Sequence, residues 1–310
     1  MEYPIDGILL VDKEEGETSY SVVRSVKSAF GGLKVQKVGH AGTLDPFATG
    51  LLIILLGQGT KLSRFIMSEG KVYTATLRLG VETDTLDPTG RQVRTSAVPD
   101  LSLGYIQEKA RIFVGDIEQV PPIYSAIKYK GERAYKLARR GLKPDLKKRK
   151  VTIGSIRILS VDLPDVTMEV RCSSGTYVRS LAAALGKELG PGGHLKSLRR
   201  SASGSFEARN ALSSKEISAK GNRKIFRDKV IPLRDAVPGM PEVEVDRFLA
   251  EKVRHGYQPA LEGLTEEFNL AGRVGGHVKI IVDDRLVAIV ELIKTRRVGH
   301  SKIKIERVFF

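Results

Sequence analysis

The sequence predicts an α+β protein with a mixed, largely antiparallel sheet, flanking helices and a small β-rich C-terminal domain. Strand-like and helix-like segments alternate through residues 7–190 without regular strand–helix–strand repeats. Beyond a proline-rich stretch at 232–241, the segments are mostly strands. The chain has 310 residues, which is enough for one large domain and a small one. We therefore expect a large domain at 1–235 and a small one at 242–310.

Hydrophobic periodicity and capping residues predict the elements of the large domain. Thr18 or Ser19 can cap a helix whose apolar face ends at Phe30, before Gly31–Gly32. Asp87–Pro88–Thr89–Gly90 is a turn signal. The predicted elements are strands at 7–11, 51–56, 72–79 and 166–172, and helices at 19–30, 106–113 and 178–189.

The small domain is predicted to contain one helix and three strands. The helix is expected at 246–254 and the strands at 276–282, 286–292 and 303–309. Basic residues gather near its end, where they either keep a sheet edge solvated or contact RNA. They are Lys294, Arg296, Arg297, Lys302, Lys304 and Arg307.

The charge of the chain points to a polyanionic partner. Lysine and arginine total 51 against 36 acidic residues, which gives a net charge of +15 and a pI near 9.8. Nucleic acid is the first candidate for such a partner, and a basic but solvated surface is the alternative.

Other compositional features limit the cofactor and the location. Cys172 is the single cysteine, and the five histidines lack metal-ligand spacing, so we expect neither a metal nor redox chemistry. The N-terminus MEYPIDGILLVDK does not resemble a secretory signal, and the apolar run 51–56 is too short to cross a bilayer. We expect a cytoplasmic monomer that does not bind a membrane.

A loop around Asp45 is the first candidate site. Asp45 is the only carboxylate between Glu17 and Glu69, and it lies in GHAGTLDPFATG at 39–50. Three glycines allow tight turns, Pro46 favours an extended Asp45, and a buried strand follows at once. A carboxylate held in this way could act as a nucleophile. The common alternative is an Asp-Pro turn in which the carboxylate bonds its own backbone.

A basic segment at 121–150 is the second candidate. It holds eleven basic residues against Glu132 and Asp145, and three tyrosines are interleaved. Lysine and arginine neutralise phosphates and aromatic rings stack on bases, so this segment predicts RNA contact. A solvated helical face is the alternative. The basic residues are Lys128, Lys130, Arg133, Lys136, Arg139, Arg140, Lys143, Lys147, Lys148, Arg149 and Lys150.

The third candidate is the turn Ser173–Leu181, where a strand ends and a helix begins. Arginine at a helix start opposes the helix dipole, so Arg179 needs a reason to be there. It could pair with a buried carboxylate, or it could be an exposed residue of the first turn.

Together these segments resemble the TruB family of pseudouridine synthases. GHAGTLDPFATG resembles the signature loop, and four further segments match in order. One departure is Glu14, which stands where the family usually carries proline. The last domain resembles a short PUA-type RNA-binding fold. The four segments are KVYTATLRLG (71–80), QVPPIYSAIKYKGERAYKLARRG (119–141), CSSGTYVRSL (172–181) and GGHLKSLRRSASGSF (192–206).

The resemblance implies a function and roles for individual residues. The chain would convert uridine 55 in the T loop of tRNA to pseudouridine without a cofactor. Asp45 would be the nucleophile, Arg179 its ionic partner, and Tyr73 the ring that stacks on the flipped uracil and helps remove its C5 proton. His40, Tyr177 and Leu198 would shape the pocket or contact RNA, and Lys128, Lys130 and Arg133 would bind the T-arm stem-loop.

Three other functions stay open at this point. A guide-RNA-dependent catalytic subunit belongs to the same superfamily, but the signature loop and compact last domain favour the stand-alone bacterial type, for which no guide RNA is expected. A non-catalytic RNA-binding protein would use Asp45 only as a turn residue. A uridine methyltransferase is disfavoured, because the sequence has neither a glycine-rich nucleotide fingerprint nor a second cysteine.

Overall fold

The computed structural model describes residues 5–31, 35–142, 144–218, 223–257, 276–294 and 301–310. Within these ranges the α+β class is confirmed. A ten-stranded sheet runs through the large domain, in the order β14-β1-β3-β12-β4-β11-β10-β7, with β2 beside β3 and β13 beside β12. Its strands are β1 (Gly7–Lys13), β2 (Val38–His40), β3 (Thr49–Leu56), β4 (Lys71–Leu79), β7 (Gly115–Gln119), β10 (Arg149–Asp162), β11 (Asp165–Cys172), β12 (Gly193–Ser203), β13 (Phe206–Glu207) and β14 (Leu212–Ser213).

Most strand pairs in this sheet are antiparallel, as predicted, but its centre is not. There β12 meets β3 in parallel through only two residue pairs, Arg199 with Thr49 and Arg200 with Gly50. Gly50 has φ +99°, and a Cβ atom there would lie 2.3 Å from the carbonyl oxygen of Arg200. Only glycine therefore allows the two halves of the sheet to join at this point.

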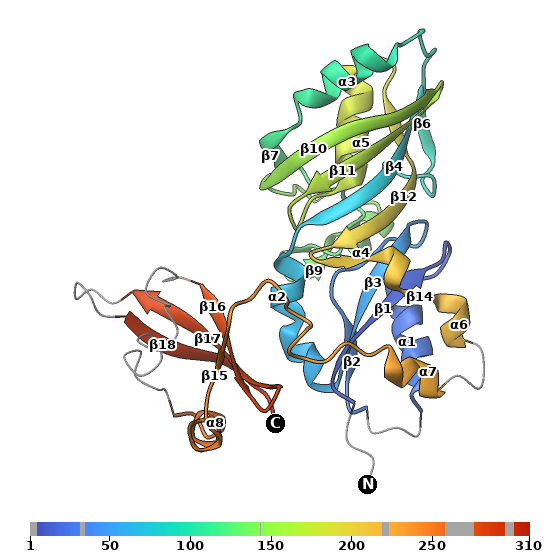
Figure 1. The fold of residues 1–310 in the computed structure, drawn as a ribbon. Helices are drawn as coiled ribbons and strands as arrows, with labels where there is room; N and C mark the ends of the chain where they lie inside the picture. Colours follow the sequence, from blue (N-terminus) through green and yellow to red (C-terminus); the bar gives the residue numbers. More distant parts are fainter. Residues whose placement is uncertain (1–4, 32–34, 143, 219–222, 258–275, 295–300) are drawn as a thin grey trace.

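Helices cover both halves of the sheet (Figure 1). α1 and α6 pack together beside β1, and α3 and α5 pack on β10, β4 and β12. Thr18 caps α1 in a capping box with Ser21, which leaves Ser19 free for another contact. The helices and helical turns are α1 (Ser19–Ala29), η1 (Gly57–Leu62), α2 (Ser63–Ser68), α3 (Leu103–Arg111), α4 (Ala134–Arg139), α5 (Val178–Glu188), η2 (Ala208–Asn210), α6 (Ser214–Ser218) and α7 (Arg223–Asp228).

The predicted elements are present with small shifts at their ends. α3 begins three residues earlier than expected because Ser102 accepts a hydrogen bond from the amide of Tyr105 and caps it. Among the strands without a sequence prediction are the long β10 and β12 and the edge strand β7. Gly32, which was expected to help end α1, lies outside the described residues.

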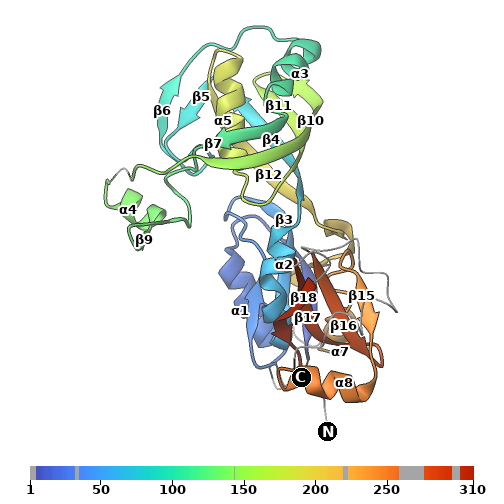
Figure 2. The same cartoon turned by 90° about the vertical axis from the view of Figure 1, so that its left-hand side faces the viewer.

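The basic segment 121–150 leaves the body as a small projection (Figure 2). It contains a two-stranded hairpin, β8 (Lys128–Tyr129) and β9 (Glu132–Arg133), followed by α4. Its last two residues, Arg149 and Lys150, already belong to β10 and pair with β7. We call residues 121–148 the arm. A second small hairpin, β5 (Val81–Thr83) with β6 (Gln92–Thr95), flanks the turn at Asp87.

The described residues of the C-terminal part form a four-stranded sheet, β15-β16-β17-β18, and one helix. Its elements are β15 (Glu242–Glu244), α8 (Arg247–Arg254), β16 (His277–Val282), β17 (Arg285–Lys294) and β18 (Ser301–Val308). Phe309 and Ile289 join one buried cluster with Leu62 and Phe65 of the large domain. Lys61 donates to the carbonyl of Val308 at 2.6 Å, so the end of the chain is bonded to η1. Arg296 and Arg297 of the terminal basic cluster lie outside the described residues.

Within the ranges described, the protein has no helix long and apolar enough to span a bilayer.

Candidate active site

The loop that carries Asp45 joins β2 to β3 and is held from several sides. Ser19, buried at the start of α1, accepts from the amide of Leu44 at 2.9 Å and donates to its carbonyl at 3.0 Å. The amide of Ala48 donates to the carbonyl of Asp45 at 3.1 Å. Gly42 takes φ +97°, which favours glycine. The residues on both sides of Asp45 are thus fixed by bonds to the main body.

Lys13 also bonds the loop that carries Asp45. It is 1% exposed at the end of β1, and its ammonium donates to the carbonyls of Glu14 and Glu17, each at 2.8 Å, and of Pro46 at 3.2 Å. Burial lowers the pKa of Lys13. Glu14, which replaces the usual proline, uses the amide that proline lacks to donate to the Glu17 carboxylate at 3.0 Å.

Arg179 lies at the centre of the site. Its Nε is 3.1 Å from Oδ2 of Asp45, so the predicted ion pair is present. The residue is 5% exposed, so the alternative of an exposed first-turn arginine is wrong. The guanidinium also donates to two main-chain carbonyls, of Thr85 at 3.2 Å and of Tyr124 at 2.9 Å. These bonds join the Asp45 loop, the turn before Asp87 and the root of the arm.

Asp87 is a second carboxylate in contact with Arg179. Its Oδ2 lies 2.9 Å from Nη1 of the arginine, and the side chain is 5% exposed. Its Oδ1 accepts from the hydroxyls of Thr85 and Thr89, each at 2.6 Å, and from the amide of Thr89 at 3.0 Å. The predicted turn is therefore correct, but its carboxylate also anchors the arginine.

The electrostatic surroundings of Asp45 act in opposite directions. Burial raises the pKa of Asp45, Arg179 and Lys13 act to lower it, and Asp87 acts to raise it. The side chain still keeps 36% of its surface exposed, so a substrate can reach the carboxylate although its surroundings are dense. Asp45 is thus an accessible carboxylate. A buried guanidinium holds its position and favours its ionised form.

The four pocket residues expected at the site come from four different elements: β4, β12, the start of α5 and β2. Tyr73 on β4 is partly buried against the core cluster that includes Leu44 and Phe47. Leu198 on β12 belongs to that cluster and is 8% exposed. Tyr177 precedes α5, and its backbone exchanges hydrogen bonds of 2.8 and 3.0 Å with the Gln119 side chain.

Burial raises the pKa of both Tyr73 and Tyr177, and Asp45 contributes to both shifts. His40 lies on β2, and its Nδ1 is buried without a hydrogen-bond partner among the described residues. Burial, with a smaller contribution from Arg200, lowers the pKa of His40, which favours a neutral ring.

Comparisons with known proteins identify the family of this chain. The family profile described as "TruB family pseudouridylate synthase (N terminal domain)" matches residues 31–178. The tRNA pseudouridine synthase B of Syntrophus aciditrophicus is 38% identical over 98% of this chain and 99% of that protein. The protein of the same name from Clostridium kluyveri is 42% identical over 81% of this chain and 84% of the other. The chain belongs to the TruB family of pseudouridine synthases. It is therefore an isomerase.

A solved structure supports the fold of this TruB family member. The chain matches one entitled "Crystal Structure of a Cbf5-Nop10-Gar1 Complex" with a TM-score of 0.73 and 27% identity, over 98% of this chain and 85% of the other. A second, "Crystal structure of the archaeal box H/ACA sRNP Nop10-Cbf5 complex", gives a TM-score of 0.72 at 25% identity. Both likenesses extend over the C-terminal sheet as well as the large domain.

Three basic residues expected at the RNA site lie outside the cluster around Asp45. Lys128, Lys130 and Arg133 are exposed in the hairpin of the arm. Lys130 lies over the ring of Tyr129, 5.6 Å from its centre, and Arg133 donates to the carbonyl of Ala126 at 3.2 Å. Lys143 is outside the described residues. The root of the arm meets the site where the Tyr124 carbonyl accepts from Arg179.

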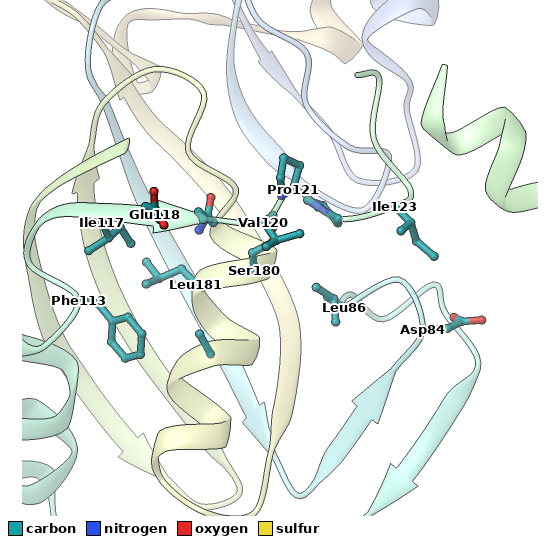
Figure 3. A pocket seen from close by; sticks show the side chains of 13 residues that line it. Asp84, Leu86, Phe113, Ile117, Glu118, Val120, Pro121, Ile123, Ser180 and Leu181 are labelled. Carbon is teal, nitrogen blue, oxygen red and sulfur yellow. The ribbon is translucent and has the colours of Figure 1, made fainter. Parts of the chain in front are cut away.

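A cavity of about 450 Å³ lies beside the root of the arm (Figure 3). Phe113, Leu181 and Leu86 are among its lining residues, and its charged members are Asp84 and Glu118. Asp45, Tyr73 and Arg179 do not line it. An apolar wall with acidic charges does not suit a phosphate backbone, so we do not assign the RNA to this cavity.

Across the described ranges, no group of three or more histidine, cysteine or acidic side chains is arranged to hold a metal ion. Lys13, Asp87 and Arg200 had no functional prediction from sequence, although all three contact or charge the site. For Arg200 a signal would have existed if β12 had been predicted. Adjacent residues of a strand face opposite sides, so one of Arg199 and Arg200 would then have been expected to point inward.

Proposed function

We propose that this TruB family member isomerises uridine 55 in the T loop of tRNA to pseudouridine, with Asp45 as its nucleophile and without a cofactor. The observation that carries the proposal is the 3.1 Å contact between Asp45 and the buried Arg179. Relatives named tRNA pseudouridine synthase B, which match nearly the whole chain, support tRNA as the substrate class.

The proposed reaction breaks the bond from ribose C1′ to N1 of uracil and forms one from C1′ to C5. No atom is added and no net redox change occurs. Asp45 must be ionised to act, and Arg179 keeps the carboxylate ionised and aimed against the effect of burial. The same placement fits attack on C1′, addition to uracil C6, or a route through a glycal-type intermediate.

The other residues of the site receive the displaced base. Tyr73 would stack on the flipped uracil and help remove its C5 proton, since a base taken from the RNA stack needs an aromatic or apolar platform. His40, Tyr177 and Leu198 would line the same space from β2, the start of α5 and β12. Their positions on separate elements suit a pocket with walls on several sides.

RNA binding is assigned to the arm and to the C-terminal unit. Lys128, Lys130 and Arg133 are exposed and lack carboxylate partners within 4 Å among the described residues, so they can neutralise phosphates of the T-arm stem-loop. We propose a stand-alone monomer that needs no guide RNA. The H/ACA assemblies named in the structural comparisons represent the alternative.

The decisive experiment uses purified protein and a T-arm stem-loop tritiated at C5 of its uridines. Release of tritium without any guide RNA, partner protein or added cofactor supports the proposal. Activity that appears only with a guide RNA would favour the guide-dependent alternative. Release that requires S-adenosylmethionine would favour a methyltransferase. A protein that binds the stem-loop but releases no tritium would be a non-catalytic RNA-binding protein.

The division at 1–235 and 242–310, with a PUA-like second domain, can be tested by truncation after Pro238. The proposed site lies wholly upstream, so turnover at saturating RNA should persist while RNA affinity falls. Loss of Phe309 and Ile289 from the cluster with Leu62 and Phe65 should also lower the melting temperature. A folded truncated protein without activity at saturating RNA would place part of the site in the C-terminal unit.

A further inference from the structure

Arg200 is a buried cation that the site described above does not use. It lies on β12 and is 2% exposed. Nε donates to the carbonyl of Leu51 at 2.7 Å, and Nη2 donates to the carbonyl of Gly42 at 3.0 Å. Gly42 lies in the signature loop before Asp45, and Leu51 follows the end of the loop on β3. One guanidinium therefore ties both ends of the loop that carries the nucleophile.

The backbone register brings the same residue to Tyr73. Arg200 is directly opposite Tyr73 in the antiparallel pair of β12 and β4. Residues opposite each other in such a pair project on the same face, so the arginine side chain and the tyrosine ring lie together. The charge of Arg200 also acts on the Tyr73 hydroxyl and tends to lower its pKa. Arg200 thus bonds the Asp45 loop and lies beside Tyr73.

The charge of Arg200 is not explained by these structural bonds. Among the described residues, no carboxylate lies within 4 Å of its guanidinium, although the other buried arginine, Arg179, has two. Two carbonyls could be bonded by a neutral donor, and a buried charge without a counter-ion is costly. With 2% of its surface exposed, Arg200 cannot bind an RNA phosphate directly. Its charge is therefore available to an anion that forms inside the site.

We propose that Arg200 is a positioning residue that orients the Tyr73 hydroxyl and stabilises its phenolate while that oxygen takes the C5 proton of the isomerised uracil. The proposal rests on the function proposed above. In that function Arg179 is the cation that pairs with the nucleophile. Arg200 would be a second cation, which acts in the proton-transfer step.

The proton transfer conserves both atoms and electrons. After the C1′–C5 bond has formed, C5 carries both the ribose and its original hydrogen. The Tyr73 hydroxyl first releases its proton to solvent. The resulting phenolate oxygen takes the C5 hydrogen as a proton, which restores the hydroxyl, and the C5–H electron pair becomes the C5–C6 double bond. The C6–N1 π pair moves to N1, which gains a proton from solvent, and the product is pseudouridine. The phenolate is needed only in this step, and it forms next to Arg200.

The electrostatics of Tyr73 agree with this role. Burial raises the pKa of Tyr73, and the nearby charge of Arg200 acts to lower it. Asp45 and Cys172 act in the same direction as burial. Without Arg200 every remaining influence on the tyrosine would disfavour the phenolate.

The test measures isomerisation in single-turnover reactions at saturating T-arm RNA, with hydrogen or deuterium at C5 of the target uridine. Arg200→Gln keeps hydrogen-bond donors but removes the charge. Its rate should fall roughly 10- to 100-fold, part of what a general base contributes. The deuterium isotope effect should exceed that of the wild type, because C5 deprotonation becomes slower than the other steps. In a Tyr73→Phe background, Arg200→Gln should cause little further loss.

Arg199→Gln is the matched control. Arg199 is the neighbouring residue on β12, its side chain is half exposed, and it pairs with Asp12 at 2.6 Å. This variant should keep the wild-type isotope effect. If Arg200→Gln does not fold, Arg200→Lys, which keeps a charge at shorter reach, should show a smaller rate loss with an isotope effect still above the wild-type value.

Two results would overturn the proposal. One is a slower Arg200 variant with an unchanged isotope effect, which would mean that Arg200 only braces the loop. The other is a full additive loss in the Tyr73→Phe background. Either result, with an active wild-type protein, would refute this inference alone. A wild-type protein that does not isomerise uridine would instead refute the proposed function.

Discussion

Arg179, at the start of α5, is 5% exposed, forms ion pairs with two carboxylates and donates to two carbonyls. Arg133, in the arm, is exposed and, within the described part of the chain, donates to the carbonyl of Ala126 alone. The first guanidinium has its position fixed by three separate segments of the chain. The second has a charge that is free to meet a partner.

This difference separates two uses of the same side chain. A buried and fully bonded arginine contributes to the geometry of a reaction, and its removal leaves carboxylates without a partner. An exposed arginine contributes to affinity through phosphate neutralisation and is weakened by salt. Substitutions in the two regions should therefore change different measured quantities: turnover and stability at the centre, and affinity and salt dependence in the arm.

The largest effect is expected from Asp45→Asn. Asparagine is nearly isosteric and accepts the extended conformation before Pro46, but it lacks the anionic oxygen. Single-turnover rates should fall by at least about 10³-fold, a loss of the size expected when a nucleophile is removed. Filter binding should give a tRNA affinity within about threefold of wild type, since the phosphate contacts remain. Near-normal tritium release from this variant would remove Asp45 from the role of nucleophile.

Arg179→Ala should damage both turnover and stability. It leaves the buried Asp87 and the partly exposed Asp45 without their common partner. Breaking a buried pair costs about 3–5 kcal/mol, so chemical denaturation should show a clear loss that Asp45→Asn does not share. Asp87→Asn is the matched variant, because it retains Arg179 but weakens its anchor. Stability equal to wild type in Arg179→Ala would mean that the ion pairs do not hold the site together.

A fourfold alanine substitution at the end of the arm and the start of β10 should lower RNA affinity without changing turnover at saturating RNA. The replaced residues are Lys147, Lys148, Arg149 and Lys150. The slope of log affinity against log salt should become shallower by roughly 0.7–0.9 for each phosphate that the protein no longer neutralises. Lys148 is 3.4 Å from Glu118, an exposed pair whose removal should cost little stability. An unchanged slope would show that these residues do not bind phosphate.

The smallest effect concerns the pH dependence of stability. Because the folded-state pKa of Asp45 is raised above its ordinary value of 3.8, the folded protein favours the protonated form more than the unfolded chain does. The stabilisation is complete below 3.8 and is lost as pH rises through the folded pKa. The melting temperature of wild type relative to Asp45→Asn should therefore decrease between pH 3.8 and neutral pH. An increase over that range would contradict the direction of the shift.

Local patterns were sufficient for much of the fold. The helix that begins after Thr18 and the helix at 178–189 were predicted because caps and apolar stripes lie within a few residues of each other. β10 was missed although Val151, Ile153, Ile156 and Ile158 are buried along it. Its first residues belong to the basic run, and charge concealed the alternation there. The parallel meeting of β3 with β12 depends on distant pairings, which no local pattern encodes.

The site shows the same limit at the level of single residues. Asp45 and Arg179 could be paired in advance through resemblance, and their ion pair is present. Asp87 was interpreted as a turn residue, which is true of one of its oxygens, while the other bonds an arginine 92 positions away. Arg200 stands in a strand that was not predicted, so its inward direction could not be assigned. The catalytic roles assigned to Asp45, Arg179 and Arg200 stay predictions.

The bond from Arg179 to the carbonyl of Tyr124 links the two regions compared above. A ligand that displaces the root of the arm must also break or strengthen that bond. Because such coupling is reciprocal, a change in the ion pair of Arg179 must alter the affinity of the arm for the ligand by the same factor. Binding of the ligand by the arm and the position of Asp45 therefore depend on the same equilibrium. A substitution at the arm root that tightens binding would also affect the Asp45 carboxylate.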